Sequence, residues 1–163
     1  MTAQEIITLA RSFIGSKGGE KFWKAYGYNY RVEWCCIFVW YLFQACKSLF
    51  YGGGRTAYVP NLWDWAKETG CTTTDPKPGD LVIFDWNKNG IPDHVGLLAA
   101  VHDSTIETVE GNVTDEVREM TRNRDGQILG YIKINYPAKQ TCDPATCPIM
   151  DYLKKIMKGE NNE

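Results

Sequence analysis

Apolar residues recur at helical spacing near the start of the chain. Thr2 and Glu5 form a capping-box pattern, in which each side chain hydrogen-bonds the backbone of the other residue. The apolar residues that follow stand three and four positions apart, which predicts a helix that ends at Gly15. They are Ile6, Ile7, Leu9, Ala10, Phe13 and Ile14.

A second apolar segment runs from Trp34 to Phe50, after a loop rich in Tyr and Gly at 22–30. The segment is apolar on every side and is long for a strand, so we expect a buried helix of about three to four turns. Gly52 and its neighbours should end this helix. A third, short helix is expected from Pro60 through Glu68, closed at Gly70.

From Pro76 onward, short apolar runs alternate with turn signals, which is typical of β-strands. The expected strands cover 81–84, 94–101, 105–110, 117–121 and 128–134, with a turn at Asp125-Gly126. Helices followed by strands with short connections favour an α+β fold with a mostly antiparallel sheet.

Length and composition limit the classes of protein that fit. The chain has 163 residues, of which 44% are hydrophobic and 23% charged, as expected for one globular domain. No run of 18 apolar residues is present, and the acidic start does not resemble a secretory signal, so we expect neither a membrane span nor a signal peptide. The net charge of -2 argues against a nucleic-acid partner. We therefore expect a protein that is made in the cytoplasm and does not bind membranes.

The hydrophobic pattern divides the chain into a catalytic domain at 1–137 and a linker or tail at 138–163 that contains a short helix, Ile149 to Met157. Cys142 and Cys147 lie in this tail and could form a disulfide, bind a metal or do neither. For the remaining cysteines, synthesis in a reducing compartment favours free thiols.

Cysteine and histidine supply the first candidate chemistry. Cys35 stands at the start of the apolar segment, where helix N–H groups can lower the pKa of a thiol and bind an oxyanion. Cys36 has equivalent apolar neighbours, so the spacing does not choose between the two, and either can be a core residue. Of the two histidines, His94 begins a strand after a polar loop and is the candidate base, whereas His102 precedes a turn and is expected in solvent.

A catalytic imidazole needs a third group to hold its ring. Glu110 and Asn112 lie two positions apart and can face the same side of an extended segment. An ionised Glu110 in an apolar strand requires a cationic or hydrogen-bonding partner, and the alternative is an ordinary carboxylate at a strand end.

The loop before His94 has the pattern of the first part of a calcium-binding loop. Oxygen-bearing side chains stand at positions one, three, five and nine, with Gly90 at position six, but Gly96 replaces the glutamate expected at position twelve. The candidate ligands of a structural Ca²⁺ are Asp85, Asn87, Asn89, Ile91 and Asp93. A plain hairpin turn at Asn89-Gly90 explains the same residues. No organic cofactor is expected.

Together these segments resemble the CHAP family (cysteine, histidine-dependent amidohydrolase/peptidase) of peptidoglycan hydrolases, found in phage endolysins and bacterial autolysins. The similarity covers roughly residues 1–136 and is carried by the runs Trp34-Cys35-Cys36-Ile37-Phe38-Val39, Lys77-Pro78-Gly79-Asp80-Leu81-Val82-Ile83-Phe84, Asp93-His94-Val95-Gly96, Val109-Glu110-Gly111-Asn112 and Ile128-Leu129-Gly130-Tyr131.

The resemblance implies a papain-like core in which Cys35 is the nucleophile, His94 the catalytic histidine, Glu110 its acidic partner and Asn112 an assisting residue. It also implies that the substrate is bacterial peptidoglycan, cut either between muramic acid and L-alanine or within the peptide. We expect a monomer, and the expected lack of a signal peptide fits phage-lysin-like release to the cell wall. Some members of the family carry a calcium loop before the histidine.

Two other functions fit the same residues: a calcium-stabilised wall-binding module with an inert thiol, and an intracellular cysteine protease. Trp23, Tyr26, Tyr28, Tyr30, Trp63 and Trp86 are candidate substrate contacts, although most such residues pack in a core.

Overall fold

Residues 1–137 are described by the structure, a computed structural model in which four α-helices precede a six-stranded sheet. The expected α+β fold with an antiparallel sheet is confirmed, and it is consistent with a papain-like core. The expected tail, with Cys142, Cys147 and the short helix, lies outside the described residues. Within residues 1–137, no helix has the length and apolarity that a bilayer span requires.

The helices form where caps and glycines define their ends. Helix α1 (Ala3–Arg11) begins with the expected capping box but ends at Ser12, one turn before Gly15. Helix α2 (Glu20–Tyr26) lies in a segment for which a loop was expected, and the prediction was wrong there because the left-handed Gly19 and Gly27 define a short helix between them. Helix α4 (Val59–Glu68) matches the third expected helix.

The apolar segment is not one helix. Helix α3 (Cys35–Leu42) passes into a 3₁₀ segment, η1 (Phe43–Leu49), and a short 3₁₀ turn, η2 (Tyr51–Gly53), follows. The chain bends at Cys46, whose φ of -139° is not helical. The prediction of one continuous helix was wrong because an apolar segment indicates burial and not helicity. Phe43 and Phe50 are buried and stack with ring centres 5.8 Å apart, although the backbone between them is not α-helical.

The sheet follows the strand order β1-β6-β2-β3-β4-β5, and its paired strands are antiparallel. Its strands are β1 (Thr72–Thr73), β2 (Leu81–Phe84), β3 (His94–Val101), β4 (Thr105–Val113), β5 (Glu116–Asn123) and β6 (Ile128–Ile132). The predicted bounds of β2 and β3 are confirmed; β4 and β5 are longer than predicted, β6 is shorter, and the two-residue β1 was not predicted.

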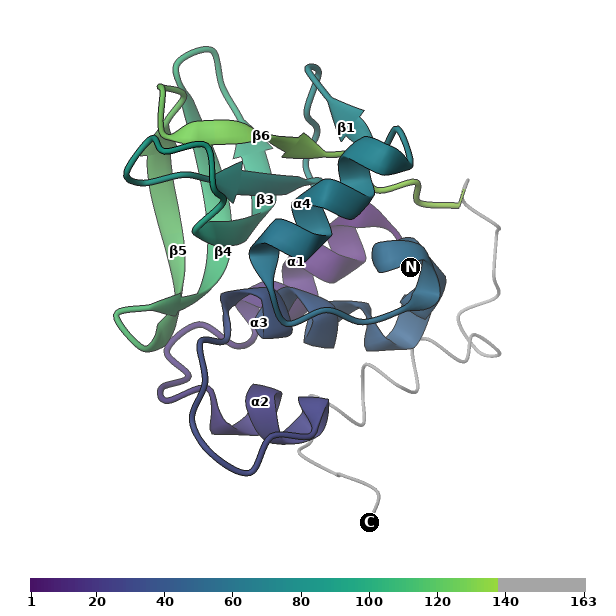
Figure 1. Ribbon diagram of the computed structural model, residues 1–163, viewed down its shortest axis with the longest axis vertical. Coiled ribbons are helices and arrows are strands. Elements are labelled where there is room, and N and C mark those ends of the chain that lie inside the picture. The colour runs from purple at the N-terminus through teal and green to yellow at the C-terminus, as the bar shows by residue number, and fades with distance from the viewer. Residues whose placement is uncertain (138–163) are drawn as a thin grey trace.

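Helices and strands are segregated, with the helices gathered to one side of the sheet (Figure 1). Alternate strand residues face these helices and join the main core: Leu81, Ile83, Val95, Leu97, Val109, Val117 and Ile132. The other face carries a smaller apolar cluster of Val82, Phe84, Leu98, Ile106 and Tyr131. Strand alternation also puts Thr108 and Glu110 on the face of Ile106, so polar groups interrupt this second cluster.

Candidate active site

Cys35 is the first residue of α3, at the end of the helix where backbone N–H groups have no intrahelical acceptor. Trp34 precedes the helix and is fixed by the hydrogen bond from its indole N–H to Asp115, 3.2 Å long. Gly111 of β4 allows the close approach of this helix, because a Cβ there would lie 2.5 Å from Cβ of Phe38. The sheet therefore holds the thiol of Cys35 in a fixed and mostly buried position.

The neighbouring thiol lies in a different environment. Cys36 is fully buried, and its thiol donates a hydrogen bond to the backbone oxygen of Thr56 at 3.4 Å. Burial raises the pKa of the Cys36 thiol well above its usual value of 9.0. The structure thus separates two residues that the sequence pattern left equivalent, and Cys36 is a core residue.

His94 begins β3 and lies between the thiol and a carboxylate. Its Nε2 is 2.9 Å from Oε2 of Glu110, and its ring also hydrogen-bonds Cys35. Burial alone lowers the pKa of His94, but the hydrogen bonds and charges of Cys35 and Glu110 outweigh it and raise the pKa from 6.5 to about 9. The imidazole is therefore protonated at neutral pH.

Glu110 is completely buried but has several donors. Besides His94, its carboxylate accepts hydrogen bonds from Thr108 and from Arg122. Burial raises the pKa of the Glu110 carboxyl, but the bonds from His94, Arg122 and Thr108 outweigh burial and lower the pKa from 4.5 to about 2. Gly96 makes room for this carboxylate, since a Cβ on Gly96 would lie 2.8 Å from Cγ of Glu110.

Asn112 does not hold the imidazole in this structure. Its side-chain amide donates a hydrogen bond to Glu33, and its backbone has a left-handed φ of 64°. Asn112 nevertheless lines the same open cavity as His94, of about 300 Å³. The cavity is lined by Trp86, His94, Asn112, Val113, Arg122 and Gln127. Of the expected site residues, Cys35, His94 and Glu110 are in contact, and Asn112 lies at the rim.

The 85–93 loop has the oxygen chemistry of a calcium site but bonds mainly to its own backbone. Asp85 accepts hydrogen bonds from the N–H groups of Asn89 and Gly90 at 3.2 and 2.7 Å, and Asp93 accepts one from Trp86 at 2.8 Å. Asn87 and Asn89 accept similar bonds within the loop. These oxygens retain further lone pairs, so the donor set fits a hard cation. Within residues 1–137, no three His, Cys, Asp or Glu side chains cluster as metal ligands.

Arg122 is the member of this cluster that the sequence did not suggest. From the sequence we could infer that a buried Glu110 needs a cationic partner. The sequence did not predict the pairing of β4 with β5 that brings Arg122 to Glu110. Strand register alone points to the wrong residue, because Arg118 is directly opposite Glu110 and its guanidinium bonds Glu116 instead.

A helix-bound thiol, a strand imidazole and a buried carboxylate are the groups that cysteine-dependent hydrolysis requires, and here they lie together on a fold consistent with a papain-like core. A comparison with protein families agrees: the family model described as the CHAP domain matches residues 25–112, more than half of the chain. The chain belongs to the CHAP family, and this membership implies hydrolytic activity on peptidoglycan, as an amidase or a peptidase. No curated protein matches the chain.

Proposed function

We propose that this chain is a cysteine peptidoglycan hydrolase that cuts an amide bond of the bacterial cell wall with Cys35, His94 and Glu110. The bond is either the N-acetylmuramoyl-L-alanine amide or a peptide bond of the stem or cross-bridge. The observation that carries this proposal is the contact of one mostly buried imidazole with a thiol on one side and a fully buried carboxylate on the other.

The first step forms a thioester. Cys35 attacks the amide carbonyl as the thiolate, with its proton held by His94, and the N–H groups at the start of α3 are placed to bind the oxyanion. When the carbon–nitrogen bond breaks, the amine leaves with a proton from His94, and the acyl group remains on sulfur. The raised pKa of His94, about 9, keeps that proton available at neutral pH.

The second step releases the acyl group. His94, now neutral, takes a proton from water, the hydroxide oxygen attacks the thioester, and the thiolate leaves. Glu110 receives the N–H of Nε2 throughout, so that the other ring nitrogen faces the sulfur and the substrate. Asn112 lies at the rim of the cavity, where it can contact bound substrate.

The test compares the same substitution at two neighbouring positions. Cys35→Ser should reduce the release of labelled fragments from purified peptidoglycan by at least about 10³-fold. Cys36→Ser should retain activity, because serine also donates to the backbone oxygen of Thr56. Equal release by the Cys35 variant and the wild type would refute Cys35 as the nucleophile. Binding to walls without any release by the wild type would support the wall-binding module, and cleavage of casein but not of walls would support a protein-degrading protease.

The new terminus in the digest identifies the bond. A free muramic acid carboxyl with a new N-terminal alanine defines an amidase, and any other new amine defines an endopeptidase.

We also propose that the 85–93 loop binds a structural Ca²⁺ through Asp85, Asn87, Asn89, Asp93 and the backbone oxygen of Ile91. The oxygen-only donor set supports this site, and the loop ends directly before His94. The ion would order the loop and takes no part in the acyl transfer.

We further propose that the protein acts as a monomer at the bacterial wall, as a phage lysin does.

A further inference from the structure

Arg122 of β5 forms a two-pronged contact with the carboxylate of Glu110. Its Nε donates to Oε1 at 3.0 Å and its Nη2 donates to Oε2 at 2.7 Å. The paired geometry fixes the plane of the carboxylate as well as its position, which a single hydrogen bond does not do. Oε2 is also the atom that faces Nε2 of His94, so the guanidinium and the imidazole share one acceptor.

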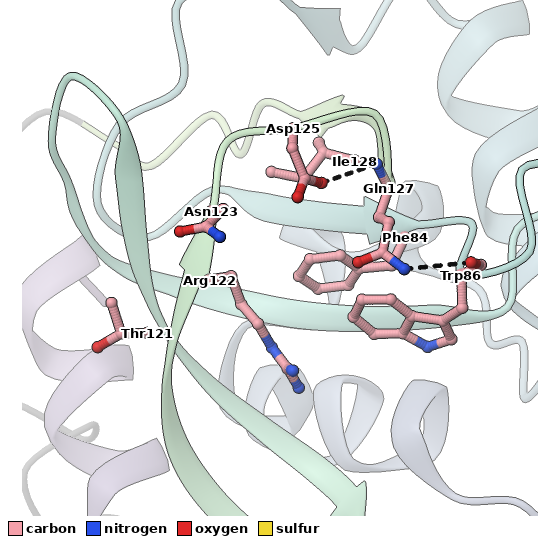
Figure 2. Close-up of a pocket in the computed structure, with 8 residues that line it drawn as sticks. All are labelled: Phe84, Trp86, Thr121, Arg122, Asn123, Asp125, Gln127 and Ile128. Carbon is pink, nitrogen blue, oxygen red and sulfur yellow. Dashed lines mark hydrogen bonds between the residues drawn. The ribbon is translucent and has the colours of Figure 1, made fainter.

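The side chain of Arg122 is itself held by aromatic rings. Phe84 and Trp86 stack at 4.4 Å with an interplanar angle of 14°, and the guanidinium of Arg122 lies 5.0 Å from the centre of the Trp86 ring. Figure 2 shows the two rings one above the other, with Arg122 extending from β5 toward them. Gln127 completes the support by donating to the backbone oxygen of Trp86 at 3.2 Å. These contacts place the guanidinium against Glu110 in the absence of substrate.

This contact differs from the surface ion pairs of the same strand. Arg118 also pairs with a carboxylate, at 3.0 Å from Oε2 of Glu116, but nearly half of its side chain is exposed and its partner is not part of the site. The side chain of Arg122 is 25% exposed, and its partner Glu110 is 0% exposed. Removing the cation beside a buried carboxylate costs free energy and allows the carboxylate to shift toward other donors. An exposed carboxylate that loses its cation is solvated by water.

We propose that Arg122 is a positioning residue for catalysis, which fixes the Glu110 carboxylate and, through it, the ring of His94. The inference rests on the proposed function of Cys35, His94 and Glu110. Within residues 1–137, Arg122 donates its side-chain hydrogen bonds to Glu110 and not to Cys35 or His94, so it acts through Glu110. Substituting it should therefore act mainly on kcat. Arg122 also lines the cavity beside His94, so a rise in KM reports lost contact with substrate, and the fall in kcat reports the positioning role.

The experiment measures initial rates on a series of concentrations of purified, labelled peptidoglycan. Arg122→Gln removes the fork and the charge, and we expect kcat to fall by about 10- to 100-fold, a larger factor than any rise in KM. Arg118→Gln is the matched control, on the same strand and with the same loss of charge, and should keep the wild-type kcat. Equal kcat values for the two variants would overturn the inference.

A double-mutant cycle separates positioning from a general loss of stability. If Arg122 acts through Glu110, Arg122→Gln in a Glu110→Gln background should reduce kcat by less than about twofold further, because the carboxylate it positions is gone. Additive losses would contradict the inference. Should the glutamine variant not fold, Arg122→Lys decides: it keeps the charge without the fork, and a wild-type kcat in this variant would refute the role of the fork.

Cys35→Ser and His94→Ala in the same assay test the proposed function itself. If either one retains wall hydrolysis, the proposed function fails. If both lose it and Arg122→Gln keeps the wild-type kcat, the inference on Arg122 fails alone.

Discussion

The two ends of strand β3 carry two histidine–glutamate pairs that are similar in distance and different in surroundings. At one end, Nε2 of His94 is 2.9 Å from Glu110; just beyond the other end, Nε2 of His102 is 3.2 Å from Glu107. The side chains of the first pair are 10% and 0% exposed, and those of the second are 53% and 40% exposed. Both glutamates belong to β4.

Burial and a thiol, more than distance, distinguish the two pairs. Water competes for both partners of the exposed pair, so its contact contributes little to structure or reactivity. The pair at the start of β3 is removed from water, contacts Cys35, and has a second cation on its carboxylate. The exposed His102–Glu107 pair is therefore a control for the buried His94–Glu110 pair within the same two strands.

The largest expected effect is on the histidines themselves. His94→Ala removes the group that donates a proton to the leaving amine, and we expect wall hydrolysis to fall by about 10²- to 10⁴-fold. His102→Ala should change the rate by less than about twofold. Rates on purified peptidoglycan measure both, and a comparable loss in the two variants would remove the distinction between the two ends of the strand.

The carboxylates should differ in the same direction. Glu110→Gln should lower kcat by about 10- to 100-fold, whereas Glu107→Gln should leave it unchanged.

In the wild type, the alkaline limb of kcat/KM should lie near pH 9, because His94 remains protonated until its pKa of about 9. Since the charge of Glu110 contributes to raising that pKa, the limb should move to lower pH in Glu110→Gln. A limb that stays in place in this variant would show that Glu110 does not act on His94.

The contribution of Glu110 to the stability of the fold should decrease at low pH, and that of Glu107 should not. The pKa of Glu110 is lowered in the folded protein from 4.5 to about 2, so its contribution to stability is complete above about pH 4.5 and is lost as the pH falls toward 2. The difference in Tm between the wild type and Glu110→Gln should therefore shrink over this range. The matched Glu107→Gln variant should show a much smaller change in Tm at every pH, and a difference for Glu110→Gln that does not vary with pH would contradict the lowered pKa.

The smallest expected effect concerns the loop that leads to His94. Removing Ca²⁺ with EDTA should lower Tm by a few degrees, and added Ca²⁺ but not Mg²⁺ should restore it, because a ligand that binds only the folded state stabilises it. Asp85→Asn should show a weaker response. A Tm that does not respond to EDTA would exclude the calcium site and leave the catalytic pair unaffected.

The sequence predicted the strands of the site better than its helices. Alternation and turn residues defined β3 to the residue, and the strand was correctly expected to begin at His94. Sequence spacing could not show which of Cys35 and Cys36 is in the site. The partners that distinguish them, His94 and the backbone of Thr56, come from distant parts of the chain. The resemblance to a family made that choice, and the structure supplies its physical reason.

Arg122 shows the limit of local patterns. Its contact with Glu110 depends on the pairing of β4 with β5 and on a long side chain that reaches along the sheet from a position opposite Ile106, whereas Arg118 is directly opposite Glu110. The helix α2 and the bend at Cys46 were missed for a related reason, because backbone geometry at those points depends on glycines and core packing that apolar spacing does not encode.

Alkylation of the wild-type protein tests the central contact most directly. Iodoacetamide at near-neutral pH, followed by peptide mapping, should modify Cys35 first, with loss of wall hydrolysis in proportion to its modification, and the rate of modification should fall sharply in His94→Ala. Cys36, fully buried, should remain unmodified in the folded protein. If Cys35 is carboxamidomethylated while hydrolysis persists, or if its rate does not depend on His94, the thiol and the imidazole do not form the catalytic pair.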